Sequence, residues 1–373
     1  MKRVFIISDF ILGSGLTQYS LNIMNSGKFK NTEFIPVSIS GRQDMLDKLY
    51  PLRESYCISA VNKSVFKHVT DWWNVSKKFK GTNTVVYFNI SATWNFIPLI
   101  IVRLRGLNNI IIHAHSDYYS KTPKTKIGLF VLNCLNGLGK KVFFDFGQYH
   151  FACSEKAAKW VFPINANENN QVKILKNAIQ TEKFQYNEKA RQKMRTLLEL
   201  EKTDIVIGHV GGYMIRKNQE LLIKTVACLI EEKIPVKLVL IGDGALKEHY
   251  EQLIDDLHIE DSVFLIPTNN EINEWYNAMD IFAFPSITEG LGMAFVEAQT
   301  NGLTSVISPS IVDEAICLNN VHVAKDFSVV NWVRKFKMVI NKGFTREKNS
   351  REKVIKSGYD LSTLLEFYQS IGW

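Results

Sequence analysis

Short apolar runs alternate with amphipathic stretches at regular intervals through the second half of this chain, and this alternation restricts the fold more than any other feature. The amphipathic stretches include QELLIKTVACLI (219–230) and LKEHYEQLIDDL (246–257), whose apolar residues recur at helical spacing. The strand-like runs are IVIGHV (205–210), KLVLIG (237–242), VFLIP (263–267), IFAFP (281–285) and TSVIS (304–308). Repeated strand–helix units of this kind predict a parallel, doubly wound sheet.

The first half repeats this pattern less regularly, and the 373-residue chain is long enough for two α/β domains. Its strand candidates are VFIIS (4–8), EFIPVSI (33–39), TVVYFNI (84–90), NIIIHAH (109–115), VFFDF (142–146) and HFACS (150–154). Between the halves, residues 173–194 pass from an apolar run into a polar, charged helix, as expected of a domain junction. We place the boundary near residues 178–185, which gives domains at 1–180 and 181–357.

Positive charge is concentrated in the first half. Residues 1–180 contain 23 Lys+Arg and 10 Asp+Glu, a net charge of +13, whereas the remainder contains 22 and 27, a net charge of −5. A basic half can attract anionic lipid headgroups, a polyphosphate-linked acceptor or nucleic acid, or it can be merely a solvated surface. No nucleic-acid partner is expected, because no recognised binding motif accompanies the charge.

One basic stretch of this half, residues 61–81, interleaves aromatic side chains with lysines. The aromatic residues are Phe66, Trp72, Trp73 and Phe79, and the lysines are Lys63, Lys67, Lys77, Lys78 and Lys80. This composition is typical of a helix at a membrane interface, and equally of a helix with a buried aromatic face and a solvated lysine face. Lys121, Lys124 and Lys126 add positive charge further along. An anionic membrane surface is therefore one expected partner.

The sequence predicts a cytoplasmic protein that can bind peripherally to the inner face of the cytoplasmic membrane. The N-terminal segment MKRVFIISDF enters a short apolar strand without the features of a signal peptide. The longest uncharged stretch, residues 82–102, contains three Asn, so a core strand and helix are expected there rather than a membrane span. The five cysteines are scattered and suggest neither a disulfide framework nor a zinc site.

The strongest chemical signal follows the strand at 281–285. There a strand ends, a loop with Gly290 and Gly292 turns, and a helix begins around Met293. Helix-start amides carry partial positive charge and bind phosphate, and glycines allow the backbone to approach a ligand closely. Glu289 in the loop and Glu297 in the helix can serve different parts of one ligand. The simpler alternative is a helix cap at Glu289 and a solvated helix residue at Glu297.

The segment PSITEGLGMAFVEA that contains these residues resembles the Glu-x7-Glu motif of the family-four retaining glycosyltransferases. Further similar segments follow one another in the family's order. They are VFIISDFILGSG, IIIHAHSD, ACSEKAAKWVF, NAIQTEKF, IVIGHVGGYMIRKNQELLI, KLVLIGDG and AQTNGLTSVIS, the last with Thr304 where proline is usual. The resemblance is closest to capsule and exopolysaccharide members. It implies the GT-B fold, in which two Rossmann-like, doubly wound domains face each other across a cleft and the last helix, here 358–373, packs back on the first domain.

The resemblance also assigns roles in the donor site. Glu289 would hold sugar hydroxyls, Glu297 the ribose, and the amides that follow Glu289 the phosphates. These amides belong to Gly290, Leu291, Gly292 and Met293. Lys217, in the loop after the strand at 205–210, would neutralise the donor diphosphate in place of a metal. The sequence departs from the family at Gly212, where a second arginine is usual, and Arg216 is the candidate substitute; a solvated loop lysine is the alternative for Lys217.

In the first half, the loop Gly13-Ser14-Gly15 follows the first strand, and the family places this loop against the donor. Gln18 stands where a dinucleotide fingerprint has its third glycine, so NAD is disfavoured, and a simple strand-to-helix turn is the alternative. His115 matches a family histidine that hydrogen-bonds the transferring sugar. The simpler alternative is a histidine at the end of a strand whose hydrogen bonds are made within the protein. No metal or other cofactor is expected, since Asp-x-Asp is absent and His113 with His115 lacks a third ligand.

The resemblance implies a hexosyltransferase-type enzyme that moves a sugar from a UDP-sugar to a hydroxyl of a saccharide or lipid-linked saccharide, with retention at the anomeric carbon. Bacterial polysaccharide or glycoconjugate biosynthesis is the implied setting. Two alternatives stay open at this point. One is a nucleotide-sugar epimerase on the same fold, which needs no acceptor, and the other is a non-catalytic module that binds sugar or nucleic acid.

Overall fold

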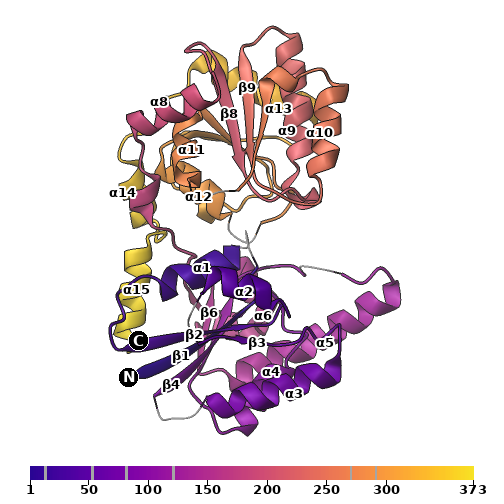
Figure 1. Ribbon diagram of the computed structural model, residues 1–373, viewed down its shortest axis with the longest axis vertical. Coiled ribbons are helices and arrows are strands. Elements are labelled where there is room, and N and C mark those ends of the chain that lie inside the picture. The colour runs from indigo at the N-terminus through magenta and orange to yellow at the C-terminus, as the bar shows by residue number, and fades with distance from the viewer. Residues whose placement is uncertain (12–14, 52–53, 80–82, 120–121, 269–270, 290–291) are drawn as a thin grey trace. The chain divides into compact units, whose positions relative to one another are not determined.

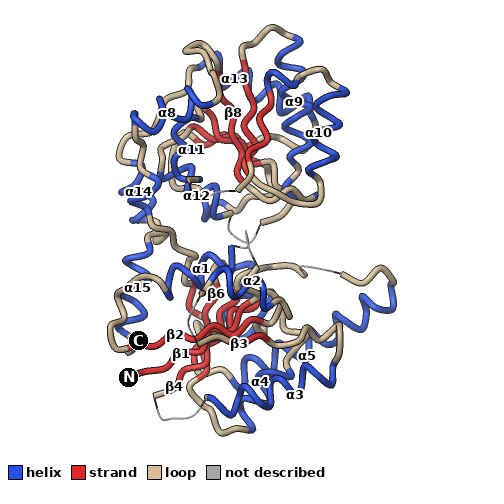
Figure 2. Tube along the Cα trace, viewed as in Figure 1, coloured by secondary structure: helices blue, strands red, loops and turns tan. Residues whose placement is uncertain are grey.

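The computed structural model of the chain describes residues 1–11, 15–51, 54–79, 83–119, 122–268, 271–289 and 292–373 (Figures 1 and 2). These residues divide into two compact units, Met1–Asn177 with Leu364–Trp373 and Ala178–Thr363. Each unit is built on one parallel sheet with helices packed against it, as Figure 2 shows with strands in red and helices in blue. The predicted α/β class with two parallel-sheet units is therefore confirmed.

The sheet of the first unit has the strand order β3-β2-β1-β4-β5-β6-β7. Its strands are β1 (Lys2–Ser8), β2 (Thr32–Ser38), β3 (Tyr56–Cys57), β4 (Thr84–Ile90), β5 (Ile110–Ala114), β6 (Tyr149–Ala152) and β7 (Lys173–Ile174). All seven residues of the central strand β4 are buried, because helices cover a parallel sheet on both faces. The strand order reverses between β1 and β4, which are neighbours.

Among the described residues, eight α-helices accompany this sheet. They are α1 (Gly15–Met24), α2 (Gln43–Leu49), α3 (Val65–Val75), α4 (Ile97–Leu104), α5 (Lys126–Phe146), α6 (Glu155–Val161), α7 (Ile164–Glu168) and α15 (Leu361–Ser370), with the short 3₁₀ turn η1 (Ser76–Lys78). The last helix, α15, completes the unit through Tyr368, whose hydroxyl lies 2.6 Å from the hydroxyls of both Tyr19 and Tyr87. The end of the chain thus packs into the core formed by its beginning.

One predicted strand of the first half is wrong. Residues 142–146, VFFDF, form the last turns of α5 rather than a strand. Phe143 continues a helical stripe of buried residues that begins at Asn136 and Gly139, whereas Asp145 is exposed. The apolar run therefore reflects one face of a helix with its partly buried flanks. The remaining strand candidates of the first half correspond to β1, β2, β4, β5 and β6.

The central part of the aromatic and lysine-rich stretch forms α3 (Val65–Val75), which begins where the side chain of Ser64 accepts a hydrogen bond from the Lys67 amide. Trp72 is fully buried and joins the core of the first unit together with Phe79. Phe66 lies on the outer side and is 81% exposed. The interpretation as a buried aromatic face thus holds for Trp72 and Phe79 and does not extend to Phe66. The uncharged stretch at 82–102 supplies β4 and α4, as predicted.

The sheet of the second unit has the order β10-β9-β8-β11-β12-β13. Its strands are β8 (Ile205–Val210), β9 (Val236–Ile241), β10 (Val263–Ile266), β11 (Ile281–Phe284), β12 (Thr304–Ile307) and β13 (Val321–Val323). The first five match their predicted positions to within one residue at each end. The short edge strand β13 was not predicted, and its three residues are half-buried or exposed.

Helices cover both faces of this second sheet. They are α8 (Glu188–Leu197), α9 (Gln219–Glu231), α10 (Lys247–Asp256), α11 (Ile272–Ala278), α12 (Met293–Thr300), α13 (Val329–Lys342) and α14 (Ser350–Lys356), with 3₁₀ turns η2 (Thr181–Phe184), η3 (Ile215–Lys217), η4 (Glu260–Ser262) and η5 (Asp313–Ala315). One core contains residues of α9, α10 and α13, and the other contains residues of α8, α11 and α12. Both faces of the sheet are therefore covered by packed helices.

Candidate functional site

The sheet of the second unit has one switch point, between β8 and β11. From β8 the chain proceeds to β9 and β10 on one side, and from β11 it proceeds to β12 and β13 on the other. Ligands of open α/β sheets bind where the strand order reverses, beside the carboxyl ends of the strands. The loops that leave those two ends contain Arg216 and Lys217 after β8 and Glu289 after β11. The fold thus brings together residues that are 73 positions apart in the sequence.

Hydrogen bonds hold these two loops against each other. The amide of Ile287 donates to the carbonyl of Arg216 at 2.8 Å, and the side-chain amide of Asn218 lies 3.4 Å from the carbonyl of Pro285. Asn218 adopts a left-handed conformation (φ 56°), which ends the turn η3 and allows α9 to begin at once. The two consecutive cations of η3 are consequently fixed beside the loop that contains Glu289.

The loop after β9 closes the other side of this region, and it requires glycine. A Cβ atom at Gly242 would lie 2.1 Å from the carbonyl oxygen of Gly211. Gly244 has φ 156°, and a Cβ there would lie 2.4 Å from the carbonyl oxygen of Tyr213. Gly212 is under no comparable restriction, since a Cβ at that position would meet the methyl of Met214 at 3.2 Å and the carbonyl of Asp243 at 3.4 Å.

Glu289 is the centre of an ion cluster. Its Oε1 atom lies 2.6 Å from Lys217 Nζ and 3.3 Å from Arg216 Nη1, and the side chains of Glu289 and Lys217 are only 10% and 12% exposed. Lys217 Nζ also lies 5.4 Å from the centroid of the Phe284 ring. Burial alone would raise the pKa of Glu289, but the positive charges of Lys217 and Arg216 outweigh it and lower that pKa. Glu289 is therefore ionised at neutral pH.

Glu297 has the opposite electrostatic environment, although it is only eight residues away. It lies in α12 and accepts a hydrogen bond from the Tyr276 hydroxyl at 2.7 Å. Burial raises the pKa of Glu297 to about 7, against smaller lowering effects of the Tyr276 hydrogen bond and the Lys217 charge. The structure does not place Glu297 as a freely solvated helix residue. The motif thus contains one carboxylate and one carboxyl group that titrates near neutrality.

The start of α12 depends on a glycine. Gly292 precedes the helix with φ 76°, and a Cβ there would lie 2.8 Å from the ring of Phe284, so both conformation and space exclude a larger residue. Met293 is the first helical residue, as predicted, and the positive end of the helix dipole lies at this point. Gly290 and Leu291, which were predicted to contribute phosphate-binding amides, lie outside the described residues.

His209 was not predicted and lies within this region, as the penultimate residue of β8. Its Nδ1 atom lies 2.9 Å from the carbonyl oxygen of Ala283, which can only accept, so Nδ1 carries the proton. Burial lowers the pKa of His209 to about 4, so the ring is neutral and Nε2 is an acceptor. Nε2 is buried without a hydrogen-bond partner among the described residues. A histidine at the carboxyl end of a strand, in IVIGHV, was the available sequence signal.

The predicted residues of the first half lie in the other unit. His115 is buried, with Nδ1 2.8 Å from Asn177 Oδ1 and Nε2 2.8 Å from Asn89 Oδ1. Burial lowers its pKa to about 3, so the ring is neutral and one of the two amides must turn its NH₂ group toward it. A sugar hydroxyl would have to replace one of these partners. Gly15 begins α1, and Ser14 lies outside the described residues.

No group of three or more His, Cys, Asp or Glu side chains that could hold a metal ion occurs within the described ranges. His113, the neighbour of His115 on the same strand face, lies 2.6 Å from the Tyr87 hydroxyl through Nδ1 and 3.2 Å from the Leu175 carbonyl through Nε2. The histidine pair is therefore part of the hydrogen-bonded core of the first unit.

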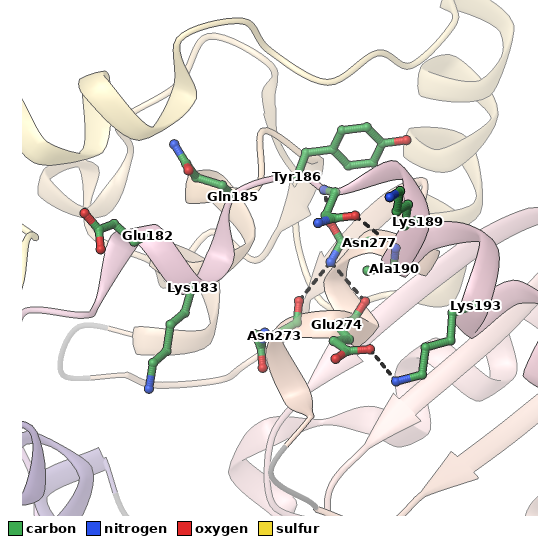
Figure 3. A pocket seen from close by; sticks show the side chains of 11 residues that line it. Glu182, Lys183, Gln185, Tyr186, Lys189, Ala190, Lys193, Asn273, Glu274 and Asn277 are labelled. Carbon is green, nitrogen blue, oxygen red and sulfur yellow. Dashed lines mark hydrogen bonds and ion pairs between the residues drawn. The ribbon is translucent and has the colours of Figure 1, made fainter.

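A pocket of about 470 Å³ in the second unit lies apart from the switch point (Figure 3). Its lining comes from η2, α8 and α11 and consists of Glu182, Lys183, Gln185, Tyr186, Asn187, Lys189, Ala190, Lys193, Asn273, Glu274 and Asn277. Figure 3 shows that Asn277 and Glu274 already take part in hydrogen bonds and an ion pair with their neighbours. Asn277 precedes β11 and thus lies toward the amino end of that strand, opposite to Glu289. None of the predicted site residues lines this pocket.

Comparison with known proteins gives results for both sequence and fold. Residues 190–360 match the family model described as Glycosyl transferases group 1. The putative glycosyltransferase EpsF of Bacillus subtilis is 28% identical over 76% of this chain and 73% of its own length. An Escherichia coli protein named UDP-Gal:alpha-D-GlcNAc-diphosphoundecaprenol alpha-1,3-galactosyltransferase is 23% identical over 66% of this chain and 63% of its own.

Among solved structures, Anabaena Alr3699/HepE in complex with UDP and glucose has a TM-score of 0.77 against this chain, with 15% sequence identity over 100% of this chain and 99% of that one. At this identity the similarity concerns the fold, and it agrees with the two parallel-sheet units. The predicted fold class is therefore confirmed, and so is the family resemblance inferred from the sequence. Retention at the anomeric carbon was predicted with it and stays a prediction.

Proposed function

We propose that this chain, whose residues 190–360 match the family model of the glycosyl transferases group 1, moves a hexose from a UDP-sugar to a hydroxyl of a saccharide or lipid-linked saccharide acceptor. We include in this proposal retention at the anomeric carbon and a reaction that needs no metal or other cofactor. The observation that carries the proposal is the ion cluster of Glu289, Lys217 and Arg216 at the switch point of the second sheet.

The cluster is suited to a ligand that is anionic at one end and rich in hydroxyls at the other. Without ligand, Glu289 pairs with both Lys217 and Arg216, whose side chains are 12% and 32% exposed. A diphosphate carries more negative charge than Glu289 and is a better partner for Lys217 and Arg216. Binding would release the oxygens of Glu289, which can then accept hydrogen bonds from sugar hydroxyls. The same two cations would stabilise the charge that develops on the departing UDP, which is the role of a metal in other enzymes.

The remaining groups extend this division of roles along the donor. Glu297 lies in α12, the helix that follows the loop containing Glu289. Its carboxyl group can bind the two hydroxyls of a ribose. The amides at the start of α12, from Gly292 and Met293 onward, lie at the positive end of a helix and suit phosphate oxygens. We assign His115 and the Ser14–Gly15 loop of the first unit to the sugar end, on the family resemblance alone.

The acceptor is the least constrained part of the proposal. The E. coli relative is named for a diphosphoundecaprenol-linked acceptor, and the first half of this chain has a net charge of +13. A lipid-linked diphosphate would be attracted by that charge and would be presented at a membrane surface. We therefore propose a place in the assembly of a bacterial polysaccharide or glycoconjugate, with the protein bound peripherally to the cytoplasmic face of the membrane.

A donor screen followed by product analysis tests this function. The protein is first tested for thermal stabilisation by UDP-glucose, UDP-galactose, UDP-N-acetylhexosamines and GDP- and dTDP-sugars. The stabilising donor is then incubated with a lipid-linked saccharide, and the new glycosidic bond is examined by NMR. We expect UDP release that requires the acceptor, and the donor's own anomeric configuration in the product. An inverted product contradicts retention, and an epimer formed from the donor alone supports the epimerase instead.

A further inference from the structure

Helix α5 of the first unit exposes an unusual amount of apolar surface. Ile127, Phe130, Val131, Leu135 and Leu138 are 78%, 69%, 48%, 38% and 55% exposed. They stand at positions i, i+3, i+4, i+8 and i+11, so they form a single stripe along the helix, with exposed Cys134 at i+7. Figure 1 shows α5 in magenta extending beyond the other helices on its side of the first sheet. We refer to these five residues as the α5 stripe.

The opposite side of α5 attaches the helix to its own unit. Asn136 accepts hydrogen bonds from the Thr93 amide at 2.8 Å and, through its backbone carbonyl, from the Thr93 hydroxyl at 2.7 Å. Gly139 packs so closely that an added Cβ would lie 1.9 Å from the Thr93 carbonyl oxygen. Phe143 then enters the core. The second half of the helix is therefore firmly held, and the stripe points away from the surface to which it is attached.

The charged side chains in and just before α5 are almost all positive. Residues 118–144 contain five lysines and no Asp or Glu. Lys124 and Lys126 lie at the beginning of α5, and Lys140 and Lys141 lie just after the stripe. Between them, residues 127–139 carry no charged side chain. An apolar stripe with cations at both ends is complementary to a bilayer surface that contains anionic lipid.

The dimensions favour a helix that lies in the membrane surface over one that spans it. Within the described part of the chain, α5 is the one helix that is long and apolar enough to cross a membrane, and 17% of its most apolar 18-residue window is buried. The uncharged segment 127–139 is about 20 Å long, shorter than a hydrocarbon core of about 30 Å. The remainder of the helix contains the buried Phe143 and the charged Lys140, Lys141 and Asp145. The stripe can enter the interface while Phe143 stays in the protein core.

We propose that α5 is a membrane-docking helix, which inserts the α5 stripe into the headgroup and acyl boundary of an anionic bilayer. A second copy of the chain is the less suitable occupant. Two α5 helices packed stripe to stripe in antiparallel orientation would place the lysines at one end beside the lysines at the other. The proposal deepens the peripheral membrane binding included in the proposed function by assigning it to one surface. It does not depend on the donor chemistry, because the residues of the proposed donor cluster all belong to the second unit.

Vesicle flotation tests the docking helix. The full chain is compared with the triple variant Ile127→Ser, Phe130→Ser and Leu138→Ser, on vesicles of phosphatidylcholine alone and of phosphatidylcholine with phosphatidylglycerol. A matched control variant changes Leu197, Val330 and Met338 to serine, since these residues are similarly exposed apolar helix positions of the second unit. We expect the wild type and the control to float with the anionic vesicles. The stripe variant should lose roughly a hundredfold in partitioning, because three apolar side chains no longer leave water.

Equal flotation of the stripe variant and the wild type overturns the proposal, and so does a wild type that binds neither kind of vesicle. A wild type that is dimeric without lipid, and that the stripe variant converts to a monomer, would instead identify the stripe as a subunit interface. Binding of UDP to the stripe variant should equal that of the wild type. This second readout separates a failure of docking from a failure of the proposed donor site, and an unchanged thermal unfolding transition shows that the first unit of the variant is folded.

Discussion

The ion cluster of the second unit and the α5 stripe of the first depart from ordinary residue burial in opposite directions. At the cluster, Glu289 and Lys217 are almost completely buried, although charged side chains are normally exposed. At the stripe, Ile127 and Phe130 are mostly exposed, although such side chains are normally buried. Each arrangement suggests a partner: a ligand that pairs with the buried cations in the first case, and a surface that covers the apolar side chains in the second. A diphosphate suits the first and a bilayer suits the second.

The largest effect is expected at Lys217, where one substitution tests whether the buried ion cluster binds a diphosphate. The change Lys217→Ala should lower turnover at saturating donor by roughly a hundredfold to a thousandfold, because it removes a preorganised charge that stabilises the leaving diphosphate. Initial rates of UDP release measure this. Lys224→Ala is the control, since Lys224 is an exposed lysine of α9 paired with Glu220 on the surface. An unchanged rate in Lys217→Ala would remove the residue from the site.

The pH dependence of stability tests whether Glu297 differs from Glu289 as the structure indicates. The folded protein raises the pKa of Glu297 from 4.5 to about 7. Between these values the folded state retains a proton that the unfolded chain has released, so the free energy of unfolding falls as pH rises through this window. The contribution of Glu297 is at most about 3 kcal/mol, or roughly a hundredfold in the folding equilibrium.

Urea unfolding of the wild type and of Glu297→Gln at pH 5 and pH 8 checks this prediction. The wild type should lose more stability than the variant on going to the higher pH, since glutamine does not ionise. Identical pH dependence of the two proteins would mean that Glu297 titrates normally. Glu289 is expected to contribute in the opposite sense, because its pKa is lowered and its stabilising effect is lost at acid pH.

The change Glu289→Gln separates two roles of one carboxylate. Turnover should fall roughly tenfold to a hundredfold, because hydrogen bonds to the sugar hydroxyls are weakened. Affinity for UDP without a sugar should rise by roughly threefold to tenfold, since the carboxylate no longer competes with the diphosphate for Lys217 and Arg216. Calorimetric titration with UDP measures the second effect. A weaker affinity for UDP would show that Glu289 supports the diphosphate site rather than competing with it.

The smallest effect is expected at Gly212, where the family resemblance and this sequence differ. A Cβ there would meet the flexible end of Met214 at 3.2 Å, which is 42% exposed and can move aside, and the Asp243 carbonyl oxygen at an ordinary contact distance of 3.4 Å. Gly212→Arg should therefore raise UDP affinity by roughly threefold to tenfold through one more cation, whereas Gly212→Ala should leave it unchanged. If the arginine variant gains nothing, Arg216 already fulfils this role.

Much of the fold could be predicted because the strands of a parallel sheet are buried on both faces and appear as continuous apolar runs, as in β4, β8 and β11. Glu289 and Glu297 could be predicted for a different reason, since a strand, a glycine loop and a helix start follow one another within one short segment. The contact between Glu289 and Lys217 could not be derived locally. It depends on β8 and β11 being neighbours, which a long-range reversal of strand order decides.

Helix α5 was missed, and its final turns were taken for a strand. Its first turns contain no charged face that would reveal helical periodicity, and VFFDF near its end contains the aromatic residues typical of strands. The solvent exposure of the α5 stripe could not be predicted from the sequence either, because the apolar composition of α5 is equally typical of a helix in a protein core. His209 was overlooked because a lone histidine in a strand is indistinguishable from a satisfied core residue until its orphaned Nε2 is seen.

The central claim is that the cluster of Glu289, Lys217 and Arg216 is the binding site for the diphosphate of a UDP-sugar. Calorimetric titration of the wild type and Lys217→Ala with UDP-sugars, in the presence of a metal chelator, tests it most directly. The account predicts that the wild type binds one of these donors without metal and that Lys217→Ala loses at least tenfold in affinity, in line with the loss of a charge-assisted contact. Equal affinities of the two proteins, or binding only when a divalent metal is restored, would contradict it.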